Sequence, residues 1–98
     1  MSNEFAGKTV IISGAAGGIG LALAEALAQQ GMNIVMGDID NVALAESSKG
    51  LREQGFDVLT CALDVTDYSQ WEDIVANAKE KFGKVHICLL YTSDAADE

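Results

Sequence analysis

The sequence predicts an α/β fold with a parallel sheet, and three observations support this prediction. Short apolar runs alternate with stretches of helical periodicity, in the order β-α-β-α-β-α-β. The apolar runs are continuous, which indicates strands buried on both faces, as in parallel sheets. Each helical stretch ends at a glycine. Because parallel strands need crossover connections, each predicted helix returns the chain to begin the next strand.

The first strand and helix have the clearest pattern. Residues 8–13 (K-T-V-I-I-S) are a β-branched apolar run that ends at Gly14, and they predict a buried strand. A glycine-rich turn follows over residues 14–20. Residues 19–30 are dense in Ala and Leu and predict a helix. We expect it to end at Gly31, because glycine favours the left-handed C-terminal cap.

The remaining elements follow in the same alternation. Residues 33–36 predict a second strand, residues 41–54 a helix diluted by Ser and Gly, and residues 56–63 a third strand. Asp67 is an expected N-cap, with Gln70 at the spacing of a capping box. An apolar helical stripe then ends at Gly83 and comprises Trp71, Ile74, Val75, Ala78 and Phe82. A fourth strand is expected over residues 85–91.

Composition narrows the function classes. The chain has 98 residues, a formal net charge of −9 and 49% apolar residues, which indicates a globular domain or part of one. The acidic balance argues against nucleic-acid and anionic-membrane partners. No apolar run approaches the roughly 20 residues that span a bilayer, and the N-terminus lacks a signal-peptide pattern, so we expect a cytoplasmic protein. Cys61 and Cys88 are too few for a disulfide framework or a four-ligand zinc site, and no metal is expected.

The turn after the first strand carries the main functional signal. It reads S-G-A-A-G-G-I-G from Ser13 to Gly20, between a predicted strand and a predicted helix. Glycines there allow positive φ, close approach of the backbone to a ligand, and tight packing of the helix on the turn. The free N–H groups and the positive dipole end of the helix suit a pyrophosphate. A tight strand-to-helix turn without a ligand is the alternative.

Acidic residues at the next two strand ends support the ligand hypothesis. Asp38 follows Gly20 by 18 residues, close to the spacing of an acid that binds adenosine ribose hydroxyls. Asp64 and Val65 follow the third strand, where they could bracket an adenine ring. The alternatives are a solvated turn carboxylate for Asp38 and a helix-start residue for Asp64.

Two rival nucleotide motifs fit less well. Gly7-Lys8-Thr9 imitates the end of a P-loop, but Ser2 stands where glycine is required and the segment precedes a strand. Methyltransferases that use S-adenosylmethionine share the acid after the second strand, yet their glycines are more closely spaced than Gly14, Gly18 and Gly20.

These residues together resemble a known family. S-G-A-A-G-G-I-G resembles the T-G-x-x-x-G-x-G fingerprint of short-chain dehydrogenases/reductases, with Ser13 in place of Thr. Asp64-Val65 looks like the adenine-binding pair of that family, and F-G-K-V-H-I like the start of its fourth strand. The resemblance covers residues 5–87. It implies the amino-terminal half of a Rossmann-type fold with a doubly wound parallel sheet. It also implies hydride transfer between a nicotinamide dinucleotide and a small-molecule alcohol or carbonyl in the full-length protein.

The resemblance also implies the cofactor-binding residues. Asp38 would bind the ribose hydroxyls and repel a 2′-phosphate, and Gly17 stands where NADP-preferring members often have a basic residue, so NAD is expected in preference to NADP. The residues expected to bind the cofactor are Ser13, Gly14, Gly17, Gly18, Ile19, Gly20, Asp38, Ile39, Asp64 and Val65.

The end of the chain departs from the family pattern. The family continues with N-N-A-G and later a catalytic Tyr-x-x-x-Lys, but here Glu72 follows Tyr68 by four residues and Ala95 follows Tyr91. No catalytic residue is therefore assigned, and this chain alone is expected to be inactive, because proton transfer lacks its acid/base group. A small nucleotide-binding module without catalysis and a non-enzymatic remnant are the alternative functions.

The last eleven residues have a separate explanation. Residues 88–98 (C-L-L-Y-T-S-D-A-A-D-E) resemble the in-frame translation of a transposase sequencing adapter. We therefore expect residues 1–87 to be a truncated Rossmann domain and residues 88–98 a non-native tail, and we assign no role to Ser93. A divergent natural C-terminus is the alternative. The full-length protein is expected to be a homo-oligomer by family resemblance.

Four further residues are expected to be structural. His86 reads as a surface or strand-end residue, since no second His or Cys pair accompanies it. Cys61 reads as a small buried hydrophobe. Trp71 and Phe82 lie on the apolar helical stripe and are expected in the core.

Overall fold

The computed structural model describes residues 5–89, with side chains through residue 86. Seven elements alternate in the predicted order. They are β1 (Thr9–Ser13), α1 (Gly18–Gln29), β2 (Asn33–Asp38), α2 (Asn41–Glu53), β3 (Val58–Ala62), α3 (Tyr68–Phe82) and β4 (Ile87–Leu89). No helix in the described part of the chain combines the length and the apolar character needed to cross a membrane.

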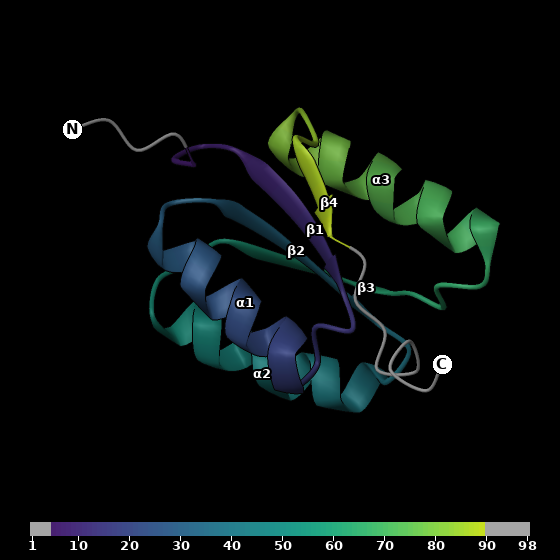
Figure 1. Ribbon diagram of the computed structural model, residues 1–98, viewed down its shortest axis with the longest axis horizontal. Helices are drawn as coiled ribbons and strands as arrows, with labels where there is room; N and C mark the ends of the chain where they lie inside the picture. The colour runs from purple at the N-terminus through teal and green to yellow at the C-terminus, as the bar shows by residue number, and fades with distance from the viewer. Residues whose placement is uncertain (1–4, 90–98) are drawn as a thin grey trace.

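The four strands form one parallel sheet in the order β3-β2-β1-β4. The chain first adds strands on one side of β1 and then returns to its other side, so the direction of strand addition reverses at β1. Because parallel crossovers are right-handed, the reversal places α3 on the face opposite to α1 and α2 (Figure 1). The observed sheet is the amino-terminal half of a doubly wound α/β fold, as predicted.

Strand β1 is buried on both faces, which explains its continuous apolar sequence. Val10 and Ile12 lie in the core beneath α1 and α2, whereas Ile11 lies in the second core beneath α3. All three side chains are fully buried. The prediction of a strand buried on both faces is confirmed.

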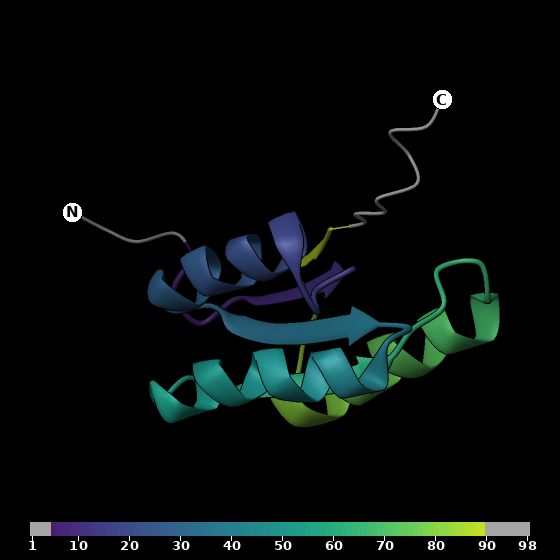
Figure 2. The same ribbon diagram turned by 90° about the horizontal axis from the view of Figure 1, so that it is seen from below.

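The carboxyl ends of the strands and the beginnings of the helices lie at the same end of the sheet (Figures 1 and 2). In a doubly wound sheet, ligands bind at this end, at the point where strand addition reverses direction. The reversal lies between β1 and β4, so the turn from β1 to α1 occupies the expected position.

Several predicted boundaries shift by a few residues. The second strand extends to Asp38 rather than ending at residue 36, and the third covers five residues rather than residues 56–63. The helix predicted over residues 19–30 begins and ends one residue earlier, and Gly31 after it has φ +90°, as expected for a left-handed cap. The calls on Tyr91 and Ser93 lie outside the described residues.

The predicted capping box at α3 is wrong in one half. Asp67 caps the helix, with its Oδ1 accepting from the backbone N–H of Ser69 at 3.0 Å. The Gln70 side chain does not return to the Asp67 N–H, which donates instead to the Asp64 carbonyl at 2.8 Å. Gln70 Oε1 accepts from the Asp64 N–H at 2.7 Å, so it holds the loop before the helix rather than the cap itself.

Candidate functional site

The glycine turn joins β1 to α1 in a conformation that depends on glycine. Gly14 and Gly18 have φ of +65° and +61°, in the left-handed region that side chains disfavour. At Gly20 a Cβ atom would lie 2.1 Å from the Gly14 carbonyl oxygen. The first turn of α1 therefore packs directly on the turn, as predicted from the glycine spacing, and Ser13 lies fully buried at the end of β1.

The amino end of α1 has no side-chain cap. Gly17 occupies the N-cap position, and the first turn of the helix contains no acidic residue. Ile19 beside it is 63% exposed. The first N–H groups of a helix have no partner within the helix, so this end presents hydrogen-bond donors and a positive dipole to a ligand. A pyrophosphate matches both properties.

Asp38 at the end of β2 lies against the glycine turn. Its Oδ2 accepts from the backbone N–H of Ala16 at 3.0 Å, and its Oδ1 accepts from the N–H of Asp40 at 3.0 Å. The Ala15 N–H donates to the Gly37 carbonyl at 3.1 Å. One oxygen of the carboxylate thus stabilises the turn that follows β2, and the other connects that turn to the glycine turn. Ile39, the next residue, is 70% exposed.

The third predicted group lies after β3. Asp64 Oδ1 accepts from the Thr66 hydroxyl at 2.7 Å and from its backbone N–H at 3.0 Å. These two hydrogen bonds hold the pKa of the Asp64 carboxyl below its usual range. Val65 is half-buried against the core beneath α3, and its carbonyl accepts from Trp71 Nε1 at 3.1 Å.

The end of β3 is joined to the end of β2. The Leu63 N–H donates to the Asp38 carbonyl at 3.0 Å. The strand ends that carry Asp38 and Asp64 are therefore neighbours, and the glycine turn lies beside Asp38. The structure brings the glycine turn, Asp38 and the Asp64-Val65 pair together at the carboxyl ends of the strands.

Two residues at this edge were missed by sequence reasoning. At Gly37 a Cβ atom would lie 2.8 Å from Leu63 Cδ2 and 3.0 Å from Ile74 Cδ1, so the end of β2 has no room for a side chain. The Ser47 hydroxyl on α2 donates to the Ala16 carbonyl in the glycine turn. No local signal identifies Ser47, because a serine within a predicted helix reads only as a weak helix former.

The remaining candidates lie elsewhere. His86 Nδ1 accepts from the Thr9 N–H at 3.0 Å, and the His86 N–H donates to the Thr9 carbonyl, also at 3.0 Å. It therefore lies at the amino end of β1, away from the glycine turn, as a strand-end residue. Trp71 and Phe82 pack against the core beneath α3, as predicted. Within the described residues no group of three or more His, Cys, Asp or Glu side chains could hold a metal ion.

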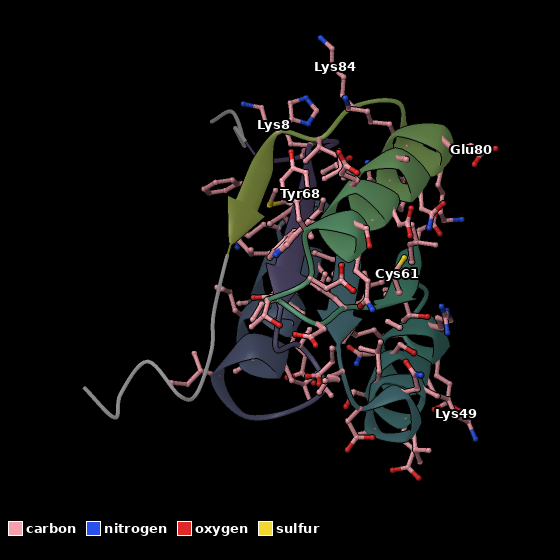
Figure 3. All side chains as sticks on the ribbon, turned by 90° about the vertical axis from the view of Figure 1, so that its right-hand side faces the viewer. Lys8, Lys49, Cys61, Tyr68, Glu80 and Lys84 are labelled. Atoms are coloured by element: carbon pink, nitrogen blue, oxygen red, sulfur yellow. The ribbon has the colours of Figure 1, made fainter. Side chains whose placement is uncertain are left out.

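Cys61 was expected to be buried and is only partly so. Its sulfur lies 3.7 Å from Asn77 Nδ2 of α3. Partial burial raises the pKa of the thiol. Figure 3 shows Cys61 and Tyr68 on opposite flanks of α3. A groove of about 440 Å³ follows the Tyr68 flank and is lined by Tyr68, Trp71, Glu72, Val75, Ala76 and Lys79.

Comparison with known proteins places the chain in a family. The family model for short chain dehydrogenases matches residues 8–91, which is most of the chain. The chain therefore belongs to the short-chain dehydrogenase/reductase family.

Curated relatives have similar sequences but are longer. The diacetyl reductase [(S)-acetoin forming] of Staphylococcus epidermidis is 40% identical over 80 residues, covering 82% of this chain and 31% of the relative. The 2,5-dichloro-2,5-cyclohexadiene-1,4-diol dehydrogenase LinX of Sphingobium indicum is 40% identical over 87 residues, covering 85% of this chain and 33% of the relative. The chain thus spans about a third of the length of these relatives.

Solved structures agree with the fold. A short-chain dehydrogenase/reductase from Burkholderia phymatum in complex with NAD superposes with a TM-score of 0.85 and 41% identity, covering 87% of this chain and 30% of that one. A hydroxysteroid dehydrogenase from Escherichia coli superposes with a TM-score of 0.84 and 30% identity, covering 90% of this chain and 37% of that one.

Proposed function

We propose that the chain is the NAD-binding part of a short-chain dehydrogenase/reductase that acts on an alcohol or carbonyl substrate. The observation that carries the proposal is the uncapped amino end of α1 beside the Asp38 carboxylate, at the edge where strand addition reverses. When bound, the nicotinamide cofactor supplies or accepts the hydride.

The described residues fit a dinucleotide. Gly17 and Gly18 have no side chains at the amino end of α1, and an added Cβ at either position would meet no atom within 4 Å, so a pyrophosphate can approach the backbone N–H groups there. We infer that Ser13, Gly17, Gly18 and Ile19 complete this part of the site. In the same proposal Asp38 and Ile39 bind the adenosine ribose end, and Asp64 and Val65 border the adenine.

The preference for NAD rests on charge. Asp38 presents a half-buried carboxylate at the end of β2, and a 2′-phosphate beside it would bring two anions together in a partly dehydrated crevice. Gly17, before the second fingerprint glycine, supplies no cation to offset that repulsion. The Burkholderia phymatum relative in complex with NAD supports the same choice.

The catalytic acid/base group is proposed to lie outside this chain. We infer that residues 1–87 correspond to the amino-terminal part of a longer Rossmann domain and that residues 88–98 are not native to it. The family match extends to residue 91, and Cys88 and Leu89 pair with β1, so neither observation marks a boundary at residue 87. Sequencing the source locus tests the inference that residues 88–98 are not native. A native reading frame that encodes the same last eleven residues would contradict it.

Family membership carries the rest of the proposal. We infer from it a small-molecule substrate and a homo-oligomeric full-length enzyme. The cytoplasmic location stays a proposal that rests on the sequence pattern alone. With the catalytic group elsewhere, the purified 98-residue chain should oxidise no NADH in the presence of a carbonyl substrate. Sustained oxidation above background would contradict the assignment of catalysis to a missing segment.

The binding proposal is tested by calorimetric titration of the 98-residue chain with NAD and NADP. We expect NAD to bind at least tenfold more tightly, and Asp38→Asn to narrow that ratio because the repelling charge is removed while an acceptor oxygen remains. Asp57→Asn is the matched control, because it removes the same charge from a carboxylate that lies before the amino end of β3 and pairs with Lys81 of α3. Equal affinity of the wild-type chain for both cofactors would overturn the NAD preference.

A further inference from the structure

Ala16, in the middle of the glycine turn, has both of its backbone polar groups bonded to side chains of distant elements. Its N–H donates to Asp38 Oδ2 at the end of β2, at 3.0 Å. Its carbonyl accepts from the Ser47 hydroxyl on α2. Asp38 and Ser47 follow Ala16 by 22 and 31 residues, so these contacts exist only because β2 and α2 pack against the turn.

This double contact matters because the glycines that flank Ala15 and Ala16 have high intrinsic backbone freedom. Glycines lie on both sides of the Ala15-Ala16 pair, and glycine loses more conformational freedom on ordering than any other residue. A binding turn that is already ordered avoids part of this loss when a ligand binds. Side-chain contacts to Ala16 therefore help to order the turn before a ligand binds. Asp38 combines this contact with its proposed role at the adenosine ribose, whereas Ser47 makes only the contact with the turn.

The position of Ser47 on α2 suits this role. Leu44, Ser48 and Leu51 form the buried face of the helix. Ser47 is half-buried on the neighbouring flank, from which its hydroxyl reaches the turn before α1. The adjacent Ser48 hydroxyl points elsewhere, donating to the Ala45 carbonyl at 3.1 Å and accepting from Arg52 at 3.2 Å.

We propose that Ser47 is a positioning residue for the dinucleotide-binding turn. It holds the Ala16 carbonyl while Asp38 holds the Ala16 N–H, and the peptide units on both sides of Ala16 are thereby fixed. Gly17 and the first N–H groups of α1 then face the crevice before the cofactor arrives. The proposal rests on the nucleotide-binding function proposed above and extends it to a residue of α2 that lies outside the fingerprint.

The first test uses the ligand-free 98-residue chain, so that it does not depend on cofactor binding. Amide hydrogen exchange is measured by nuclear magnetic resonance for wild type, Ser47→Ala, Ser47→Thr and Ser48→Ala, with Ala16 normalised to Val10 of β1. We expect Ser47→Ala to accelerate Ala16 exchange about threefold to tenfold and to shift the Gly17 amide nitrogen resonance. Ser47→Thr retains a hydroxyl and should restore both signals.

The matched control is Ser48→Ala, which removes a hydroxyl from the same helix without contact to the turn. It should lower overall stability and leave the normalised Ala16 exchange unchanged. If Ser47→Ala leaves Ala16 exchange and the Gly17 resonance unchanged, or changes them no more than Ser48→Ala does, the positioning role is overturned.

The second test is calorimetric titration with NAD. Ser47→Ala should weaken binding about threefold to tenfold, whereas Ser47→Thr and Ser48→Ala should change it less than about twofold. Equal weakening by Ser47→Ala and Ser48→Ala would overturn the proposal as well. If the wild-type chain binds no NAD, the proposed function fails, and the exchange experiment still decides whether Ser47 holds the turn.

Discussion

The amino ends of the three helices differ in how their free N–H groups are satisfied. At α2 the Asp40 carboxylate accepts from the Ala43 N–H at 3.0 Å, and at α3 the Asp67 carboxylate accepts from the Ser69 N–H at 3.0 Å. At α1 Gly17 offers no side chain. All three ends lie at the same edge of the sheet (Figure 1), so position alone does not explain the difference.

Under the proposed function, the difference separates the ligand-binding end of α1 from the capped ends of α2 and α3. A carboxylate at the N-cap satisfies a free N–H and interacts favourably with the helix dipole. At α1 the same carboxylate would occupy the position proposed for the pyrophosphate and would repel it. The helix beside the reversal of strand order is left open, and the two others are closed by aspartates.

The largest expected effect comes from adding a side chain at Gly20, where the first turn of α1 packs on the glycine turn. Gly20→Ala places a Cβ atom 2.1 Å from the Gly14 carbonyl oxygen, so the turn or α1 must move. We expect overpacking to lower the free energy of unfolding by about 1–3 kcal/mol, and NAD affinity to fall more than about tenfold. Chemical denaturation and calorimetry measure the two effects.

Gly50→Ala is the control for that substitution. Gly50 lies in α2 with no atom within 4 Å of an added Cβ, so alanine should raise stability by about 1 kcal/mol through its helix propensity. If Gly20→Ala behaved like Gly50→Ala, the close contact between α1 and the turn would not limit the site.

An intermediate effect is expected from closing the open end with a charge. Gly17 has extended backbone angles that other residues adopt, and an added Cβ there meets no atom within 4 Å. Gly17→Asp should therefore change stability by only a few tenths of a kcal/mol while it weakens NAD binding about tenfold or more by repelling the pyrophosphate.

Gly17→Asn separates charge from capping, because it offers an acceptor oxygen without a charge. We expect its NAD affinity to lie between those of the wild type and Gly17→Asp. Equal affinity of Gly17→Asp and the wild type, measured by calorimetry, would show that the open end does not receive the phosphates.

The smallest expected effect is the loss of stability at low pH that arises from Asp64 and Asp67, in and before the amino end of α3. Hydrogen bonds from Thr66 and Ser69 lower the folded-state pKa of Asp64 and Asp67 below the ordinary value of 3.8. Groups with depressed pKa stabilise the fold above their unfolded pKa, and this stability is lost as the pH falls through the folded pKa. We therefore expect stability to decline below a pH of about 4.

The comparison of wild type with Ser69→Ala isolates the α3 contribution. Removing the hydroxyl that donates to Asp67 at 2.7 Å should make stability less dependent on pH below about 4, as measured by denaturation at several pH values. An identical pH dependence in the two proteins would remove Asp67 from the explanation.

Much of the fold was predictable because its signals are local. The continuous apolar run of β1, the glycine at position 31 and the N-cap Asp67 each act within a few residues, and the structure confirms them. The partner of Gln70 was predicted incorrectly, because Gln70 Oε1 accepts from the Asp64 N–H while the Asp67 N–H donates to the Asp64 carbonyl. Capping-box spacing alone cannot distinguish these two donors.

The candidate site was predictable as a set of groups but not as a connected structure. The glycine turn, Asp38 and Asp64 follow three successive strands, and parallel strands bring their carboxyl ends to one edge. The close packing of Leu63 and Ile74 on Gly37, which leaves no room for a side chain there, could not be predicted from the spacing of residues in the sequence. It depends on how β3 and α3 pack against the end of β2.

The sequence by itself determined the order of elements, the open amino end of α1 and the Asp67 cap of α3, because backbone freedom and capping depend on neighbouring residues. Only the tertiary structure decided that Asp38 and Ser47 both hold Ala16. The right-handed crossovers from β1 to β2 and from β2 to β3 pack the end of β2 and the flank of α2 against the glycine turn, and hydrogen bonds between residues this far apart form only after that packing.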